Sequence, residues 1–196
     1  MTAPLVLASA NPKKVAELRE ILAEQALGFE LVPRPDDVPD VVEDAPDFVG
    51  NARLKAAALV AATGHAALAD DSGLEVDAID GAPGVRSARF AGEDASDADN
   101  VALLLERLAG VPEAERTARF RCVIVLQRPD GTEVIADGAV EGRIISEARG
   151  GSGFGYDPVF VPLEGDGRTF AEMTADEKHA ISHRGRALRS LTTQLT

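Results

Sequence analysis

The strongest constraint on the fold of this chain is a pair of alternating segments joined by a turn. From Ala118 to Leu126 apolar side chains occupy every second position, and a second strand-like segment runs from Glu133 to Ile145. The turn residues Pro129-Asp130-Gly131 lie between the two segments. Alternation is typical of strands with two different faces, so the pattern predicts a long antiparallel hairpin. The residues expected on one face of it are Phe120, Cys122, Ile124 and Leu126.

Before the hairpin, the sequence predicts strands that alternate with helices. Leu5–Ala8 and Phe29–Val32 are short apolar runs typical of strands. Between them, Asn11-Pro12 is a helix start, followed by apolar residues at helical spacing. The stretch 33–46 contains four prolines and an excess of acidic residues, which indicates a loop.

Capping residues mark the other expected helices. The capping pairs are Asp47 with Gly64, Ser96 with Asp99, and Thr174 with Glu177. The first pair predicts a helix over Phe48–Thr63. The second predicts a helix that starts after Ser96 and runs through Leu103–Leu108, and the third predicts a helix that starts after Thr174 and ends near Leu191.

One further strand is expected between these helices. The buried run Ala66–Ala69 should stop at Asp70-Asp71-Ser72-Gly73, and Leu74 and Val76 then resume an alternating pattern. The chain shows no internal repeat and no linker over its 196 residues. We therefore expect one domain over residues 1–196, an α/β fold with a mixed central sheet that contains the long hairpin and is flanked by helices.

Charge and cysteine content exclude several classes of function. Twenty Lys and Arg against thirty-three Asp and Glu give a net charge of −13, which repels polyanions and argues against binding along a nucleic acid. Cys122 is the only cysteine, so an internal disulfide is excluded and a reducing cytoplasm is the expected location. No apolar run is long enough for a bilayer, so we expect neither membrane insertion nor export.

The segment Ser9 to Lys14 is the first candidate for ligand binding. It reads Ser9, Ala10, Asn11, Pro12, Lys13 and Lys14, between a predicted strand and a predicted helix. Free N–H groups at a helix start, together with two lysines, suit a phosphate chain. The simpler interpretation is that Asn11 only caps the helix and both lysines are solvated.

A second candidate is the acidic pair Asp70-Asp71. Neighbouring side chains on a strand point to opposite faces, so only one of the two enters a given site, and Asp71 is the candidate. Glu43, or alternatively Asp40, could supply a second carboxylate from the preceding loop. Two carboxylates match the hard oxygen preference of Mg²⁺. The simpler interpretation is an ordinary turn sequence.

Two segments nearer the C-terminus offer groups that suit a nucleoside. In 150–158, glycines permit close approach to a ligand, and Phe154 or Tyr156 offers a ring for stacking. In 178–186, basic residues offer donors to phosphate oxygens or to carbonyl groups of a base. Alternatively, these are a surface loop anchored by one aromatic residue and cations that complement a helix dipole. Together with the first two candidates they describe a nucleotide site, in which Mg²⁺ and local cations offset the negative net charge.

Six ordered segments carry a family resemblance. They are Ser-Ala-Asn-Pro-Lys-Lys-Val, Phe-Val-Gly-Asn-Ala-Arg-Leu-Lys-Ala, Ala-Asp-Asp-Ser-Gly-Leu-Glu-Val, Gly-Ala-Pro-Gly-Val-Arg-Ser-Ala-Arg, Gly-Phe-Gly-Tyr-Asp-Pro-Val-Phe and Ala-Ile-Ser-His-Arg-Gly-Arg-Ala-Leu. Together they resemble the inosine triphosphate pyrophosphatase family, also called Ham1-like or XTP/dITP diphosphatases. The resemblance implies a twisted sheet with two lobes and an active-site cleft between them. It also implies Mg²⁺-dependent hydrolysis of ITP, dITP, XTP and dXTP to monophosphate and pyrophosphate, usually by a homodimer.

The resemblance also implies roles for individual residues. Ser9 to Lys14 would bind the triphosphate, Asp71 would accept a proton and bind metal together with Glu43, and Ser72 would contact substrate. The base and phosphate pocket would contain Phe154, Gly155, Tyr156, Asp157, Lys178, His183 and Arg184. In this interpretation a water attacks in line, and Lys14 and Mg²⁺ stabilise charge on the phosphates. Ala10 and Lys13 depart from the family pattern, in which glycine is common at both positions.

Two other functions fit the same residues. A non-catalytic nucleotide-binding module could use the same phosphate segment, although it would gain little from buried carboxylates unless they hold a metal. A pyrophosphatase with another base preference would share the phosphate site and differ near 178–184.

Overall fold

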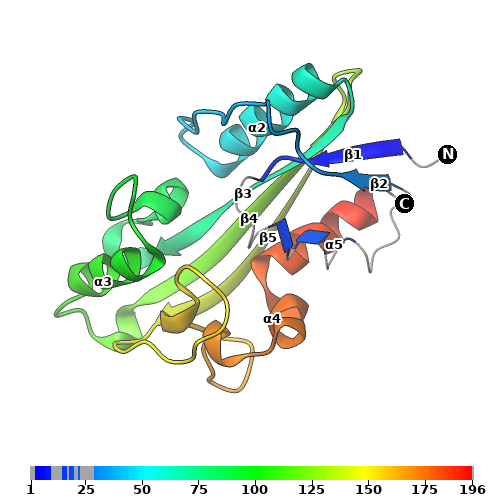
Figure 1. Ribbon diagram of the computed structural model, residues 1–196. Coiled ribbons are helices and arrows are strands. Elements are labelled where there is room, and N and C mark those ends of the chain that lie inside the picture. The colour runs from blue at the N-terminus through cyan, green and yellow to red at the C-terminus, as the bar shows by residue number, and fades with distance from the viewer. Residues whose placement is uncertain (1–2, 10–14, 17, 20–21, 23–28, 196) are drawn as a thin grey trace. The chain divides into compact units, whose positions relative to one another are not determined.

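The computed structural model describes residues 3–9, 15–16, 18–19, 22 and 29–195. Within these residues a six-stranded sheet has the order β2-β1-β3-β4-β5-β6 (Figure 1). The strands are β1 (Ala3–Leu7), β2 (Phe29–Val32), β3 (Ala66–Val76), β4 (Thr117–Gln127), β5 (Glu133–Ile144) and β6 (Phe160–Pro162). Because β1 pairs in parallel with β2 and β3 while β5 and β6 are antiparallel, the sheet is mixed, as expected.

Besides the described helical residues between 15 and 22, four α-helices and several short 3-10 helices accompany the strands in the described part of the chain. The α-helices are α2 (Phe48–Thr63), α3 (Asp97–Arg107), α4 (Ala175–Ile181) and α5 (His183–Leu195). The 3-10 helices are η1 (Asp77–Ile79), η2 (Gly84–Arg89), η3 (Glu113–Glu115), η4 (Asp157–Val159) and η5 (Phe170–Glu172). No helix among the described residues is both long enough and apolar enough to cross a membrane. The α/β class predicted from the sequence is confirmed.

The chain forms two compact units. Unit 1 contains Met1–Asp71, Cys122–Gly138 and Arg184–Thr196, and unit 2 contains Ser72–Arg121 and Ala139–His183. The strands β3, β4 and β5 therefore contribute residues to both units. Two of the unit boundaries, 71/72 and 183/184, fall inside motifs that the sequence singled out as candidate ligand sites.

In unit 1, helices cover both faces of the parallel strands (Figure 1). On one face, Leu188 and Leu191 of α5 pack in a cluster with Leu68 of β3. On the other face, Ala52 and Ala56 of α2 pack in a cluster with the neighbouring strand residues. Their small side chains let the helix backbone approach the sheet closely, which positions polar residues of α2 near β3.

In unit 2, the apolar face of the strands packs on a core that includes Leu104 of α3 and Leu108, the residue that follows this helix. The alternation of β4 continues here, so Phe120 is buried while Arg119 is half-exposed and bonded to Asp77 and Glu141. An apolar face and a polar face along one strand are what the sequence pattern predicted.

Local signals predicted several elements correctly. Helix α2 spans Phe48–Thr63, with Asp47 accepting from the Gly50 N–H and Gly64 left-handed at φ 68°. Ser96 and Asp99 form a reciprocal capping box at α3. Of the first predicted helix, the described residues are helical, whereas the proposed start at Asn11-Pro12 lies outside the described part of the chain.

Two predictions were wrong. β3 does not stop at Asp70-Asp71-Ser72-Gly73 but continues through them, because neighbouring strands pair with it and the aspartates find partners from helices. The helix capped by Thr174 and Glu177 ends at Ile181 rather than near Leu191. Ser182 is extended at φ −66° and ψ 156°, and α5 begins afresh at His183. Serine in this conformation is typical of a residue that precedes a helix.

Candidate active site

Asp71 is the centre of a buried polar cluster in unit 1. Its side chain is 6% exposed, and two residues of α2 reach its carboxylate. Asn51 donates from Nδ2 to Oδ2 at 3.0 Å, and Lys55 Nζ lies 3.5 Å from Oδ1. Asn51 and Lys55 are four residues apart, and residues at this spacing share one face of a helix. The two carboxylate oxygens of Asp71 therefore each have a different partner from α2.

Glu43 reaches the same cluster from the proline-rich loop. Its Oε2 lies 3.3 Å from Lys55 Nζ, so one ammonium group contacts the carboxylates of both Glu43 and Asp71. The loop is held against α2 by the Ala45 N–H, which donates to Asn51 Oδ1 at 3.0 Å. Gly50 permits this approach, because a Cβ at that position would lie 2.5 Å from the Ala45 Cβ.

The electrostatics of the cluster favour a charged Lys55. Burial lowers the pKa of this lysine, but the carboxylates of Asp71, Asp70 and Glu43 together raise it above its ordinary value. The ammonium group is therefore protonated at neutral pH and balances carboxylates that would otherwise repel one another.

Asp70 and Asp71 point to different faces of β3, as expected for adjacent strand residues. Asp71 faces α2, whereas Asp70 Oδ2 lies 3.7 Å from Arg184 Nη2 at the start of α5. Both side chains of the Asp70–Arg184 pair are buried. This arrangement supports the choice of Asp71 over Asp70 for the cluster that contains Glu43.

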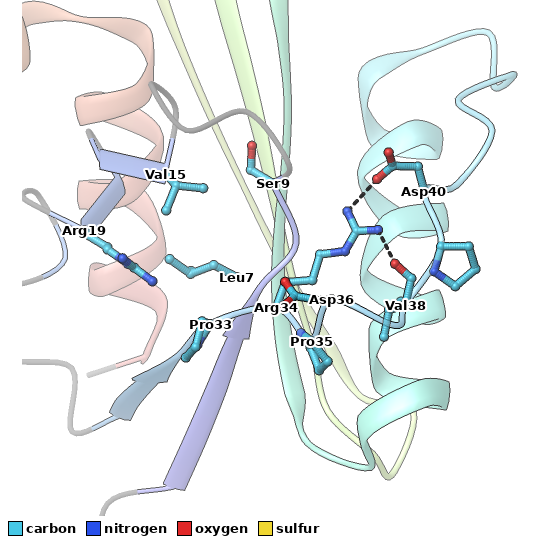
Figure 2. A pocket seen from close by; sticks show the side chains of 11 residues that line it. Leu7, Ser9, Val15, Arg19, Pro33, Arg34, Pro35, Asp36, Val38 and Asp40 are labelled. Atoms are coloured by element: carbon cyan, nitrogen blue, oxygen red, sulfur yellow. Dashed lines mark hydrogen bonds and ion pairs between the residues drawn. The ribbon is translucent and has the colours of Figure 1, made fainter.

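A pocket of about 520 Å³ in unit 1 lies beside Ser9 (Figure 2). Arg19 and residues of the proline-rich loop also line it. In this loop Arg34 donates to Asp40 Oδ1 and to the Val38 carbonyl, each at 2.7 Å, as the dashed lines show. The Asp40 side chain is 79% exposed and paired with Arg34, so Glu43 is the better second carboxylate.

In unit 2, Lys178 and Asp157 form a buried ion pair. Lys178 Nζ lies 2.7 Å from Asp157 Oδ2, with the side chains 6% and 3% exposed. The same oxygen accepts the Phe154 N–H at 2.8 Å, and Lys178 Nζ lies 4.9 Å from the centre of the Phe154 ring. Gly153, at φ 74°, permits this turn, since a Cβ there would lie 2.1 Å from Asp157 Oδ2.

The two candidate stacking rings differ in exposure. Tyr156 is 3% exposed within the core of unit 2, and its hydroxyl donates to the Ser87 carbonyl at 2.9 Å. Burial, followed by the charge of Asp97, raises the pKa of this phenol above its ordinary value. Phe154 is half-exposed, so it is the ring that suits a stacked base. His183 is buried, and its ring stacks on Phe120 at 4.8 Å between centroids.

The structure groups the predicted site residues by unit. Unit 1 holds Ser9, Glu43, Asp71 and Arg184, and unit 2 holds Ser72, Phe154 to Asp157, Lys178 and His183. The predicted phosphate-binding residues Ala10, Asn11, Pro12, Lys13 and Lys14 lie outside the described residues. Sequence reasoning quoted Asn51 and Lys55 inside a motif but gave them no role. The signal that could have found them is two polar residues four apart on a helix face rich in alanine.

The donor set of unit 1 suits a metal that retains water and substrate ligands. Among the described residues there is no group of three or more His, Cys, Asp or Glu side chains placed to hold a metal ion. The carboxylates of Glu43 and Asp71, which both contact Lys55 Nζ, match the one or two carboxylates through which Mg²⁺ is commonly bound together with substrate phosphates.

Comparisons with known proteins cover nearly the whole chain. A sequence model described as the Ham1 family matches residues 5–194. A dITP/XTP pyrophosphatase from Exiguobacterium sibiricum is 49% identical over 192 residues, which is 98% of this chain and 96% of that protein. The protein of the same name from Streptomyces avermitilis is 50% identical over 95% of this chain and 94% of its own length.

Solved structures agree with this assignment. A HAM1 protein from Coxiella burnetii superposes with a TM-score of 0.89 at 44% identity, covering 98% of each chain. A nucleoside-triphosphatase, dITP/XTP pyrophosphatase, from Mycobacterium abscessus has a TM-score of 0.78 at 47% identity and covers 98% of this chain and 100% of its own. This chain belongs to the Ham1 family.

Proposed function

We propose that this protein is a Mg²⁺-dependent pyrophosphatase that hydrolyses ITP, dITP, XTP and dXTP to the nucleoside monophosphate and pyrophosphate. It would thereby remove deaminated purines from the nucleotide pool. The observation that carries this proposal is the approach of Glu43 and Asp71 to a single half-buried ammonium group, that of Lys55. Relatives at about 50% identity over nearly the whole chain, named dITP/XTP pyrophosphatases, support the substrate class.

Asp71 and Glu43 would hold the metal, since they are the carboxylates that the fold brings to Lys55. When bound, Mg²⁺ supplies Lewis-acid stabilisation of negative charge on the phosphate oxygens. The ammonium of Lys55 would keep the two carboxylates close to one another before substrate and metal arrive, because it offsets their repulsion.

Asp71 would also act as the proton acceptor. Its carboxylate would orient a water whose oxygen forms a bond to the α-phosphorus, and it would take one proton of that water. The bond between the α-phosphorus and the bridging oxygen then breaks, and pyrophosphate leaves with the electron pair. Ser9 to Lys14 would bind the triphosphate, a role that rests on sequence alone for residues 10–14. Ser9 lines the pocket in unit 1, which supports this placement.

Selectivity would depend on hydrogen-bond donors that face the 6-position of the purine. Lys178, His183 and Arg184 are the candidate donors, and Phe154 offers the half-exposed ring for stacking. A 6-keto oxygen accepts a hydrogen bond, whereas the 6-amino group of ATP would leave a donor without an acceptor. Guanine also has a 6-keto group, so rejection of GTP must depend on the 2-position.

A pyrophosphate-release panel tests the proposed function. With Mg²⁺, purified protein should release pyrophosphate from dITP and XTP much faster than from ATP or GTP. Equal rates on all four nucleotides would contradict the selectivity. Release of orthophosphate would place the attack at another phosphorus, and binding without turnover would favour a nucleotide-binding module. Addition of EDTA should abolish turnover in this assay.

We further propose a cytoplasmic homodimer. The dimer rests on the family resemblance, and the location is consistent with the single cysteine. Sedimentation equilibrium would contradict the dimer if it gave the mass of one chain, 20.5 kDa, across the accessible concentrations.

A further inference from the structure

We propose that Asn51 is a positioning residue that orients the Asp71 carboxylate and fixes the loop that carries Glu43. This inference rests on the proposed function, because it assigns the two carboxylates to one metal site. It goes beyond that function by naming a side chain that would bind neither the metal nor the substrate and yet would set the geometry of both acidic groups.

The hydrogen bonds of Asn51 lead to two separate parts of the site. Its side chain is fully buried on α2. On one side Nδ2 donates to Asp71 Oδ2 at 3.0 Å, and on the other side Oδ1 accepts the Ala45 N–H at 3.0 Å. Ala45 lies two residues after Glu43. One carboxamide therefore ties the strand that carries Asp71 to the loop that carries Glu43.

The chemistry of the two partners determines the orientation of the amide. An ionised carboxylate oxygen accepts hydrogen bonds and cannot donate one, whereas a backbone N–H donates and cannot accept. If the amide were flipped, its carbonyl oxygen would face Asp71 Oδ2 and its NH₂ group would face the Ala45 N–H, so both contacts would become repulsive. Asn51 is therefore held in one orientation by partners on both sides.

This restraint complements that of Lys55. Asn51 contacts Oδ2 of Asp71 and Lys55 contacts Oδ1, so the plane of the carboxylate is defined by two donors one helical turn apart. Lys55 contributes charge, whereas Asn51 contributes direction, because a hydrogen bond weakens steeply as its angle departs from linearity. Partners of metal-binding carboxylates that act in this way commonly influence metal affinity and activity.

Unit 2 offers a matched control in Asn100. It is also the fourth residue of its helix, α3, and it is also buried, at 3% exposure. Its Oδ1 accepts the Ala91 N–H at 2.8 Å and its Nδ2 donates to the Ala88 carbonyl at 3.1 Å. The two asparagines thus make the same kinds of bond, except that Asn51 donates to a carboxylate and Asn100 to a backbone carbonyl.

The experiment compares Asn51→Leu with Asn100→Leu. For each full-length variant we would measure the melting temperature, the affinity of the nucleotide-free protein for Mn²⁺ as a probe of the carboxylate pair, and kcat and KM for dITP with Mg²⁺. Both substitutions should lower the melting temperature to a similar extent, because each removes two hydrogen bonds of a buried side chain. Only Asn51→Leu should lose about 10–100-fold in Mn²⁺ affinity and in kcat, with KM changed less than kcat.

A second variant separates the two hydrogen bonds. Asn51→Asp retains an acceptor for the Ala45 N–H but places an oxygen against Asp71. Its kcat should fall at least about tenfold even though the hydrogen bond from the Ala45 N–H to the side chain is kept. A kcat close to that of the unmodified protein would overturn the proposal, and this variant decides the question if Asn51→Leu does not fold.

Other outcomes are equally decisive. If folded Asn51→Leu matches Asn100→Leu in both Mn²⁺ affinity and kcat, Asn51 is structural only and the proposal is wrong. If the unmodified protein binds Mn²⁺ but does not hydrolyse dITP, the proposed function fails. The Mn²⁺ measurements then still test whether Asn51 positions the carboxylates.

Discussion

The buried pair of Lys178 and Asp157 allows a quantitative prediction about stability. Both side chains are almost fully buried, and the two charged atoms are 2.7 Å apart. Asp157 Oδ2 also accepts the Phe154 N–H at 2.8 Å, so this carboxylate shapes the loop that carries the candidate stacking ring. Replacing Lys178 by Met keeps the apolar stem and removes the ammonium group, which takes away a positive charge 2.7 Å from a buried carboxylate.

Breaking a buried ion pair from one side costs about 3–5 kcal/mol of unfolding free energy. At about 2–4 °C per kcal/mol for a chain of this size, Lys178→Met should lower the melting temperature by about 6–20 °C. The double variant Lys178→Met/Asp157→Asn leaves neither charge buried. The double variant should therefore lose less unfolding free energy than the two single variants lose in sum, by about 1–3 kcal/mol.

Urea unfolding, followed by circular dichroism, measures this coupling. It is carried out on the unmodified protein, Lys178→Met, Asp157→Asn and the double variant. Arg168→Met serves as a control, because Arg168 and Glu177 form an ion pair in the same unit with side chains 39% and 43% exposed, and such pairs contribute little. If the double variant were as unstable as the sum of the single variants, the two side chains would act independently. If Lys178→Met cost no more than Arg168→Met, the buried pair would have no special role in stability.

Two further predictions concern the acidic cluster. Asp71→Asn should lower kcat for dITP by about 10²–10⁴-fold through loss of the proton acceptor. A kcat within tenfold of that of the exposed control Asp137→Asn would assign proton transfer to another group. Gly50→Ala should weaken Mn²⁺ affinity and kcat, because the new Cβ would lie 2.5 Å from the Ala45 Cβ and displace the loop that carries Glu43. Adding Ala45→Gly to that variant should restore both quantities in part, since the contact of the new Cβ with Asp47 Oδ1 at 3.1 Å would remain, and no rescue at all would show that the contact with Ala45 does not set the loop position.

Much of the secondary structure could be predicted because its causes lie within a few residues. Asp47 and Gly64 bound α2 at the expected positions, since a cap acts on the adjacent turn of the same helix. The strand prediction failed where distant partners replaced local ones. The segment Asp70–Gly73 has the composition of a turn, yet it continues as strand β3, because Arg184 pairs with Asp70 and Asn51 bonds to Asp71.

The candidate site divides in the same way. Strand alternation indicated only that one of the two aspartates enters a given site, with Asp71 as the candidate, and the preceding loop offered Glu43 or alternatively Asp40. The sequence did not reveal roles for Asn51 and Lys55, although both lie in a motif that it singled out. Their importance depends on which residues they contact. Asp71 lies 20 positions after Asn51 and 16 after Lys55, and Glu43 lies 12 positions before Lys55.

The sequence by itself determined the family, the α/β class, the helix caps and the inventory of acidic and basic side chains. Tertiary structure alone decided that one lysine contacts two carboxylates, that one asparagine joins a loop to a strand, and that Tyr156 is buried while Phe154 is half-exposed. The physical reason is range. Caps and alternation act between near neighbours in the chain, whereas burial and ion pairing depend on segments that only folding brings together.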